Sequence, residues 1–257
     1  MKLLALLMLT FPALAQSPTP DTSFLQPVSV KFTLSNNSDS IQLKKVVVNY
    51  DDIIYVLSDN GLYRVLDGQL VPDIGYRPLA DKAPVDISVQ EESGYLYYLY
   101  EDQFLTNAHA GKPYAFLPEG QYHQLAVNRV GDVLVTGDQQ SALYRNNDWN
   151  IIDDLDAEIQ SIQCQNGQFY ALTSLGIYQL VDAQWKIFYG EEAANCIAFR
   201  DNELMVGTDN GYYGISRTDA SETTPLVSRV PVPKITALLS TSNGLWAATP
   251  QGAWLQT

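Results

Sequence analysis

The sequence has few of the residues that commonly act as nucleophiles or metal ligands. Its 257 residues include 2 cysteines, 2 histidines and 3 methionines. None of the short motifs of serine hydrolases, zinc proteases, redox dithiols or phosphate-binding loops occurs in it. We therefore expect no catalytic residues, no metal centre built on the histidines and no cofactor, and a binding module is favoured over an enzyme.

Basic residues are also scarce. The chain has 15 Lys and Arg against 29 Asp and Glu, a formal net charge of −14. Binding to nucleic acid depends on cations that neutralise phosphates, and the same holds for anionic membrane surfaces. We therefore expect no nucleic-acid partner and no membrane association.

Long apolar runs are missing, except at the N-terminus. There Lys2 precedes the apolar run Leu3–Leu14, and Ala13-Leu14-Ala15 has the small-x-small pattern of a leader cleavage site. The run is too short for a membrane-spanning helix, which needs about 20 residues. We predict a signal peptide at 1–15 cleaved after Ala15, a spacer at 16–26 and one domain at 27–257, periplasmic or secreted. An uncleaved buried helix is the alternative.

What the sequence has in abundance is repetition. A β-rich run, a Ser or Thr, two turn residues, a Gly and an aromatic recur, most clearly in Ile54–Tyr63 and Leu204–Tyr213. The Ser/Thr position of the six copies falls at residues 58, 100, 136, 173, 208 and 249, which are 35 to 42 residues apart. Each period has room for four short strands. Repeats of about 40 residues with several strands each are typical of propeller blades.

Turn residues support the strand assignment. In the period from residue 159, Asn166-Gly167 and Asp182-Ala183 separate alternating apolar runs, as in β-hairpins. The sixth copy ends after its third strand, and Val28–Leu34 offers a spare strand before the first copy. We predict an all-β fold, a six-bladed β-propeller whose last blade is closed by this N-terminal strand. Seven blades, or an open fragment of a longer propeller, are the alternatives.

The last copy carries a family resemblance. The segment from Ile235 to Trp254 resembles the two-component-regulator propeller repeat, with the form I-x-x-L followed by G-x-L-W-x-x-T-x-x-G. The copies at 54–63 and 204–213 are similar but lack the Trp. The resemblance implies a β-propeller of the kind found in exported sensor regions, and it transfers no catalytic residue. We expect any signalling partner to be a separate chain.

Candidate binding residues gather at one predicted end of the propeller. The connections between second and third strands, and between a fourth strand and the next first strand, project from the same end. The ligand- or partner-binding candidates there are Asp59, Asp102, Asp138, Asp154, Asp156, Glu158, Asp209, Tyr76, Tyr122 and His123. Tyr76 and Tyr122 are predicted in loops, where a tyrosine can stack on a sugar, and His123 is predicted in a loop near the channel.

Several interpretations of this acidic end remain open. Asp154, Asp156 and Glu158 alternate as calcium ligands can, although the spacing of the calcium-loop motif is absent. A solvated rim and a docking face for a basic partner are the others. We expect a monomeric, non-enzymatic module that binds a protein or small ligand. The alternatives are a glycan-active hydrolase or lyase with carboxylates in the central pocket, and a structural subunit of an envelope assembly.

The remaining chemistry is sparse. Cys164 and Cys196 belong to an exported chain, where a disulfide is allowed. Aligning their repeats places the two side chains on opposite faces of equivalent strands, which disfavours a bond between them. His109 and His123 are predicted at opposite ends of the propeller and should not share a metal.

Overall fold

A computed structural model describes the chain at 33–34, 42–49, 51–67, 69–73, 82–90, 92–109, 113–138, 140–153, 155–190, 193–200, 203–216, 234–241, 244–250 and 252–256. The predicted leader and spacer, the predicted domain start at residue 27, and the candidates Tyr76 and Asp154 lie outside these ranges. The chain divides into two units, Met1–Val30 and Lys31–Thr257, and all of the described residues belong to the second. No helix of the described residues is long and apolar enough to cross a membrane.

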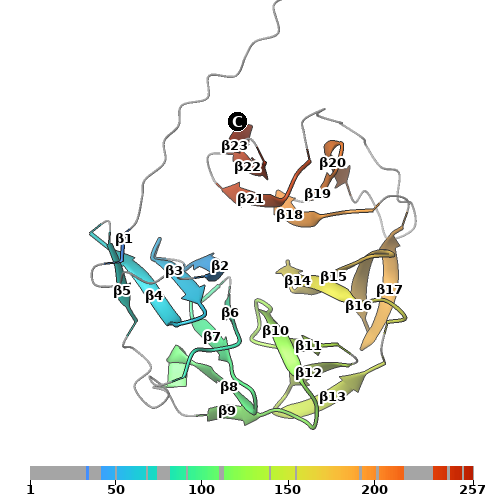
Figure 1. The fold of residues 1–257 in the computed structure, drawn as a ribbon. Helices are drawn as coiled ribbons and strands as arrows, with labels where there is room; N and C mark the ends of the chain where they lie inside the picture. The colour runs from blue at the N-terminus through green and yellow to red at the C-terminus, as the bar shows by residue number, and fades with distance from the viewer. Residues whose placement is uncertain are drawn as a thin grey trace, which may run out of the picture. The chain divides into compact units, whose positions relative to one another are not determined.

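The described residues form β-strands in six sheets that follow one another in chain order (Figure 1). The first three sheets are β2 (Leu43–Val48), β3 (Ile54–Ser58), β4 (Gly61–Leu66) and β5 (Gln69–Pro72); β6 (Asp86–Val89), β7 (Leu96–Leu99), β8 (Gln103–Thr106) and β9 (Pro113–Phe116); and β10 (Tyr122–Val127), β11 (Val133–Gly137), β12 (Ser141–Arg145) and β13 (Asp148–Ile152). The other three are β14 (Ile159–Gln165), β15 (Gln168–Thr173), β16 (Gly176–Val181) and β17 (Gln184–Tyr189); β18 (Cys196–Arg200), β19 (Glu203–Thr208) and β20 (Gly211–Ser216); and β21 (Ala237–Thr241), β22 (Gly244–Thr249) and β23 (Gly252–Gln256).

Within each sheet, consecutive strands pair antiparallel. A short 3-10 turn, η2 (Asn107–His109), is the one helical element in the described part of the chain. The predictions of an all-β fold and of a propeller arrangement are confirmed.

The predicted hairpin turns form through left-handed backbone conformations. Asn166 and Gly167 have φ angles of 51° and 78°, and Asp182 and Ala183 have φ angles of 52° and 57°. Positive φ at both central residues is the type I′ turn that matches the twist of paired strands. An alanine in this conformation is strained, because its Cβ approaches the backbone.

The recurring Ser or Thr closes the turn between the second and third strands. Thr208 Oγ1 donates to the Gly211 carbonyl at 3.0 Å and accepts from the Asn210 N–H at 3.1 Å. Ser58 and Thr173 make the same pair of bonds in their own sheets. Gly211 has a φ of 123°, which L side chains rarely adopt, so the repeat needs glycine there. The repeated Ser/Thr and Gly of the sequence therefore reflect one type of turn that recurs between the second and third strands.

The third sheet corrects the predicted register of its repeat. In the first sheet Ser58 pairs with Leu43, and a β-bulge follows. In the third sheet Gly137, not Thr136, pairs with Tyr122 before the same bulge. The Gly137 N–H donates to the Gln140 carbonyl at 2.8 Å, so the backbone closes a turn that a hydroxyl closes elsewhere. The marker residue of this repeat is therefore one position later than predicted.

The N-terminal strand lies elsewhere than predicted. β1 (Thr33–Leu34) pairs in parallel with β5, the outer strand of the first sheet, and not with the last sheet. An outer edge offers unpaired N–H and C=O groups, which accept a strand with little regard to its sequence. The prediction that this strand closes the last blade is wrong for its described residues; 28–32 lie outside them.

Apolar clusters join each sheet to the next. Five clusters of buried side chains each contain residues of two successive sheets, from the first and second to the fifth and sixth. Cys164 packs between the third and fourth sheets and Cys196 between the fifth and sixth. The two thiols are not joined in a disulfide. Their places in different clusters agree with the predicted opposite orientation, and burial raises the pKa of the Cys196 thiol to about 11.

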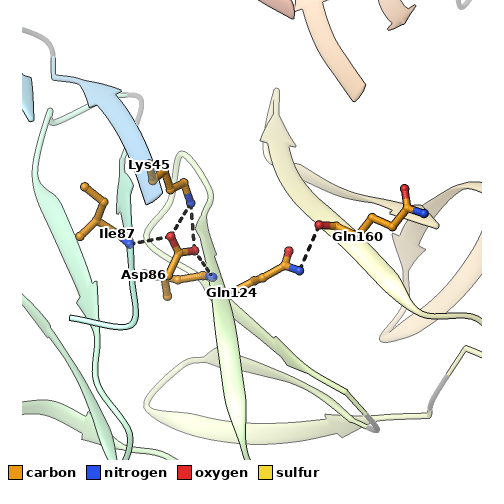
Figure 2. A network of polar contacts seen from close by, with 6 residues as sticks. Lys45, Asp86, Ile87, Gln124 and Gln160 are labelled. Atoms are coloured by element: carbon orange, nitrogen blue, oxygen red, sulfur yellow. Dashed lines mark hydrogen bonds and ion pairs between the residues drawn. The ribbon is translucent and has the colours of Figure 1, made fainter. Parts of the chain in front are cut away.

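Polar side chains on the first strands add a second connection between sheets (Figure 2). Lys45 of β2 donates to both carboxylate oxygens of Asp86 in β6, at 2.8 and 2.9 Å. Asp86 also accepts the Leu125 N–H of β10 at 2.8 Å. Gln124 of β10 donates to the Ile159 carbonyl of β14 at 3.1 Å. The inner edges of four successive sheets are therefore linked by hydrogen bonds.

The same arrangement continues along the chain. Gln163 of β14 donates to the Ile197 carbonyl of β18 at 2.7 Å, and Asn195 donates to the Ile235 carbonyl before β21 at 3.1 Å. Each amide side chain reaches a backbone carbonyl that has no strand partner on that side. Inner edges that would otherwise have unpaired groups are satisfied in this way.

Candidate functional site

The acidic candidates lie in the connections at one end of the strands. We call this the loop end: it holds the turns between second and third strands and the connections that lead into first strands. Asp59 follows β3, Asp102 follows β7, Asp138 follows β11, Asp209 follows β19, and Asp156 and Glu158 lie between β13 and β14. All six side chains are exposed. The observed order of the strands places all six residues at this end.

Two of these carboxylates hold the connections together. Asp59 Oδ1 accepts the Gln42 N–H at 3.1 Å. Asp209 Oδ1 accepts Asn195 Nδ2 at 2.7 Å and lies 3.1 Å from Lys234 Nζ. The hydrogen bonds from Asn195 and Lys234 lower the pKa of Asp209 below its usual value. These two carboxylates therefore stabilise the loops, and they already have hydrogen-bond or ionic partners within the chain.

Tyr122 and His123 occupy the start of a strand rather than a loop. Both belong to β10, and His123 is the extra residue of the bulge between Tyr122 and Gln124. Its Nε2 lies 3.5 Å from Asp138 Oδ1 at the exposed loop end. Tyr122 is buried, which raises the pKa of its hydroxyl. A buried ring cannot stack on a sugar, so the predicted role of Tyr122 does not fit its position.

The histidines lie apart. His109 belongs to η2, between the third and fourth strands of the second sheet, whereas His123 lies where a first strand begins. Connections of these two kinds are at opposite ends of the strands. No group of three or more His, Cys, Asp or Glu residues that could hold a metal ion occurs in the described ranges. The calcium hypothesis at 154–158 is not tested, because Asp154 is outside them.

A pocket of about 320 Å³ opens at the loop end of the second sheet. Its lining comes from two segments, the approach to β6 and the turn between β7 and β8: Lys82, Ala83, Val85, Tyr100, Glu101, Asp102 and Gln103. Hydrogen bonds fix both segments, from the Val85 N–H to the Leu99 carbonyl at 2.7 Å and from the Tyr100 N–H to the Gln103 carbonyl at 2.8 Å. The lining carries two carboxylates and one ammonium group.

Gln103, one of the lining residues, carries a buried side-chain oxygen outside the accessible surface of the pocket. Gln103 Oε1 is buried and accepts no hydrogen bond from the described residues. A buried carbonyl oxygen without a donor is unfavourable by about 1–3 kcal/mol. Tyr100 beside it is also buried, and its pKa rises to about 12 through burial and the nearby Asp73 charge. The lining of the pocket carries one more negative than positive charge, which suits a hydrogen-bond donor of positive charge.

The sequence pointed to Asp102 but not to the pocket around it. Gln103 begins a strand, and Lys82 belongs to a segment about 20 residues earlier in the chain. The close approach of the two segments depends on how the second sheet packs. The lack of a Gly in this degenerate repeat is the one sequence feature that marks its turn as different.

No family model and no curated protein matches the chain. Solved structures, however, match its fold. The extracellular domain of the putative hybrid two component system BT3049 from B. thetaiotaomicron is 10% identical, with a TM-score of 0.58 over 84% of this chain and 33% of that chain. YCF48 from Cyanidioschyzon merolae is 11% identical, with a TM-score of 0.56 over 84% and 81%. The computationally designed Ika8 protein is 15% identical, with a TM-score of 0.58 over 87% and 73%.

These likenesses are structural. Identities of 10 to 15% support a shared fold and nothing finer. The chain spans a third of the BT3049 domain that it matches, at 33% of its length. The comparisons therefore agree with the propeller arrangement seen in the strands.

Proposed function

We propose that the protein is a non-enzymatic, exported six-bladed β-propeller that binds a positively charged group of a partner at its loop end. The partner is a basic protein or a small ligand with a primary ammonium group. The pocket beside the β7–β8 turn is the anchor point, and the surrounding exposed acids draw the partner towards it. No nucleic acid and no insertion into a membrane is involved.

The observation that carries this proposal is the pocket at the β7–β8 turn, whose lining holds the carboxylates of Glu101 and Asp102 against the single ammonium group of Lys82. An ammonium group has three donors, so it can bond to the carboxylates of Glu101 and Asp102 together. Charge-assisted hydrogen bonds are about twice as strong as neutral ones. The formal charge of −14 favours the approach of a cation over a distance.

Export is part of the proposal because of the N-terminal pattern. The run Leu3–Leu14 and the motif Ala13-Leu14-Ala15 support a leader that is removed after Ala15. The fold is shared with a domain described as extracellular, and the repeat at 235–254 resembles propellers of exported sensors. We therefore place the mature protein in the periplasm or outside the cell, as a monomeric sensing or interaction module.

A binding titration tests the anchor. The probe is a fluorescently labelled oligolysine peptide, with an oligoglutamate of the same length for comparison, and fluorescence anisotropy is read against protein concentration. We expect the wild type to bind oligolysine alone, and the double variant Glu101→Gln, Asp102→Asn to bind it at least about tenfold more weakly. The affinity of the wild type should fall as salt rises.

The control is Asp182→Asn, which removes one negative charge where the test variant removes two. Asp182 lies in the β16–β17 turn, at the opposite end of the strands, and asparagine tolerates its positive φ. This variant removes one negative charge without touching the loop end, and it should bind like the wild type. If Asp182→Asn weakened binding as much per charge removed as the double variant does, only the net charge would matter. Wild-type protein that binds neither peptide would refute the proposed function.

A further inference from the structure

The pocket at the β7–β8 turn contains one charge that a purely cationic ligand does not explain. Glu101 and Asp102 lie in the turn, and Lys82 lies in the other lining segment, the approach to β6. A ligand ammonium group is attracted by the two carboxylates, but the ammonium group of Lys82 repels it. The lining is therefore better suited to a ligand that carries a negative group as well as a positive one.

Within the described residues, these three charged side chains have no ion-pair partners. Lys82, Glu101 and Asp102 line one small pocket, yet none of them lies within ion-pair distance of another or of any other described residue. All three residues are exposed. The carboxylates of Asp59 and Asp209, at the same loop end, differ because each is bonded within the chain. The pocket thus offers groups of both signs to a ligand.

The size of the pocket and the rest of its lining restrict the ligand further. Its volume of about 320 Å³ is at the lower end of the range of ligand pockets, about 300–1,000 Å³. The lining also includes Ala83 and Val85, both half-buried. A small ligand with an apolar group can bury that group against these two side chains. A neutral sugar would leave all three charges of the lining without a partner.

Backbone hydrogen bonds hold both lining segments in place. The Val85 N–H donates to the Leu99 carbonyl at 2.7 Å, which joins the approach to β6 to the end of β7. The Leu117 N–H donates to the Asp102 carbonyl at 3.0 Å, which joins the β7–β8 turn to the residue after β9. The positive and negative groups are therefore on separate, fixed segments, and a ligand that fits them needs little ordering of the backbone.

We infer that the pocket binds a neutral α-amino acid with an apolar side chain, its ammonium group on Glu101 and Asp102 and its carboxylate on Lys82. The apolar side chain of the ligand lies against Ala83 and Val85. This inference rests on the proposed function, because it takes the ammonium site as given and names the class of ligand that carries the ammonium group. Both charges of the ligand are on one carbon atom, so a small pocket can bind them together.

Isothermal titration calorimetry of the purified protein tests this ligand class. The probes are L-leucine, isoamylamine, which is leucine without its carboxylate, and isocaproic acid, which is leucine without its ammonium group. We expect leucine to bind at least about tenfold more tightly than isoamylamine, because a hydrogen bond to a charged group adds to its affinity. Isocaproic acid should show no measurable binding, because the two carboxylates of the turn repel it.

The variant Lys82→Gln separates the two ends of the ligand. The affinity for leucine should fall to that for isoamylamine, whereas the affinities for isoamylamine and labelled oligolysine should stay the same or rise, because a repelling cation is gone. The matched control is Lys186→Gln, which makes the same change of charge at an exposed lysine on the outer strand β17. This variant should bind leucine like the wild type.

The outcomes distinguish this inference from the function on which it rests. Wild-type protein that binds isoamylamine as tightly as leucine, or oligolysine but not leucine, would overturn the amino-acid inference and leave the proposed function standing. An unchanged affinity of Lys82→Gln for leucine would overturn the inference as well. Wild-type protein that binds none of leucine, isoamylamine and oligolysine would refute the proposed function itself.

Discussion

Asp86 is the side chain whose replacement tests the packing of the inner strands most sharply. Its Oδ1 accepts Lys45 Nζ and the Ile87 N–H, both at 2.8 Å, and its Oδ2 accepts Lys45 Nζ at 2.9 Å and the Leu125 N–H at 2.8 Å (Figure 2). Asp86→Asn keeps the shape but turns one acceptor into a donor. The new amide nitrogen must then face the Ile87 or the Leu125 N–H, and that donor loses its acceptor.

The magnitude follows from these contacts. A buried donor without an acceptor costs about 1–3 kcal/mol, and the loss of charge weakens the contact with Lys45. We expect Asp86→Asn to lower the free energy of unfolding by about 2–4 kcal/mol. Lys45→Met should cost only about 1 kcal/mol, because the Lys45 side chain is 36% exposed and Asp86 keeps both backbone donors.

Urea unfolding measures both changes. Tryptophan fluorescence and far-ultraviolet circular dichroism must give coincident transitions before a single free energy is assigned. An Asp86→Asn variant within about 0.5 kcal/mol of the wild type would refute the reasoning. So would a Lys45→Met variant that loses more stability than Asp86→Asn, because the cation would then matter more than the backbone donors.

Three further predictions concern turns and burial. Ala183→Gly should stabilise the fold by about 0.5–1 kcal/mol in thermal unfolding, and Gly167→Ala should destabilise it by a similar amount, because both positions have positive φ. An added Cβ at Gly167 meets no atom within 4 Å, so backbone strain alone sets the size of that effect. Stability changes of the same sign for the two variants would contradict this. Thr208→Val should cost about 1 kcal/mol more in urea unfolding than Thr136→Val, because Thr136 Oγ1 is buried without a hydrogen bond in the described residues; the reverse order would be evidence against the turn account. Burial raises the pKa of Tyr97 from 10.0 to about 12, so its stabilising contribution is complete below pH 10.0 and is lost as the pH rises to about 12; Tyr97→Phe should flatten the alkaline decline in stability, and an unchanged slope would contradict the shift.

The repeat was predictable because the same turn recurs in several sheets and requires the same residue types each time. Ser58 and Thr208, with the glycine three residues later, show the hydroxyl bonds that the pattern implied. The third repeat was placed one residue off because Gly137 closes its turn by backbone alone, and Thr136 looked like the missing hydroxyl. Where a turn is closed by a hydrogen bond between backbone groups, no particular side chain is required, so the sequence does not show where the turn lies.

The candidate site was predictable only in outline. Strand order places Asp102 at the loop end from sequence alone, but the pocket needs the approach to β6 beside the β7–β8 turn. Tyr122 was misplaced because its strand begins with a bulge, which hides the alternation of buried and exposed residues. The pairing of Thr33 and Leu34 with the outer edge of the first sheet was not predictable either, because strands pair at an edge through backbone groups that all residues share.

The most direct test of the central claim is to map where a cationic probe binds. Hydrogen–deuterium exchange of the mature protein, measured with and without saturating oligolysine, reports which backbone amides the peptide protects. The account predicts slower exchange at 82–85 and 100–103, the two segments that line the pocket, and no change at the Asp182-Ala183 turn at the opposite end. Protection at that opposite turn, or none at the pocket segments, would contradict it.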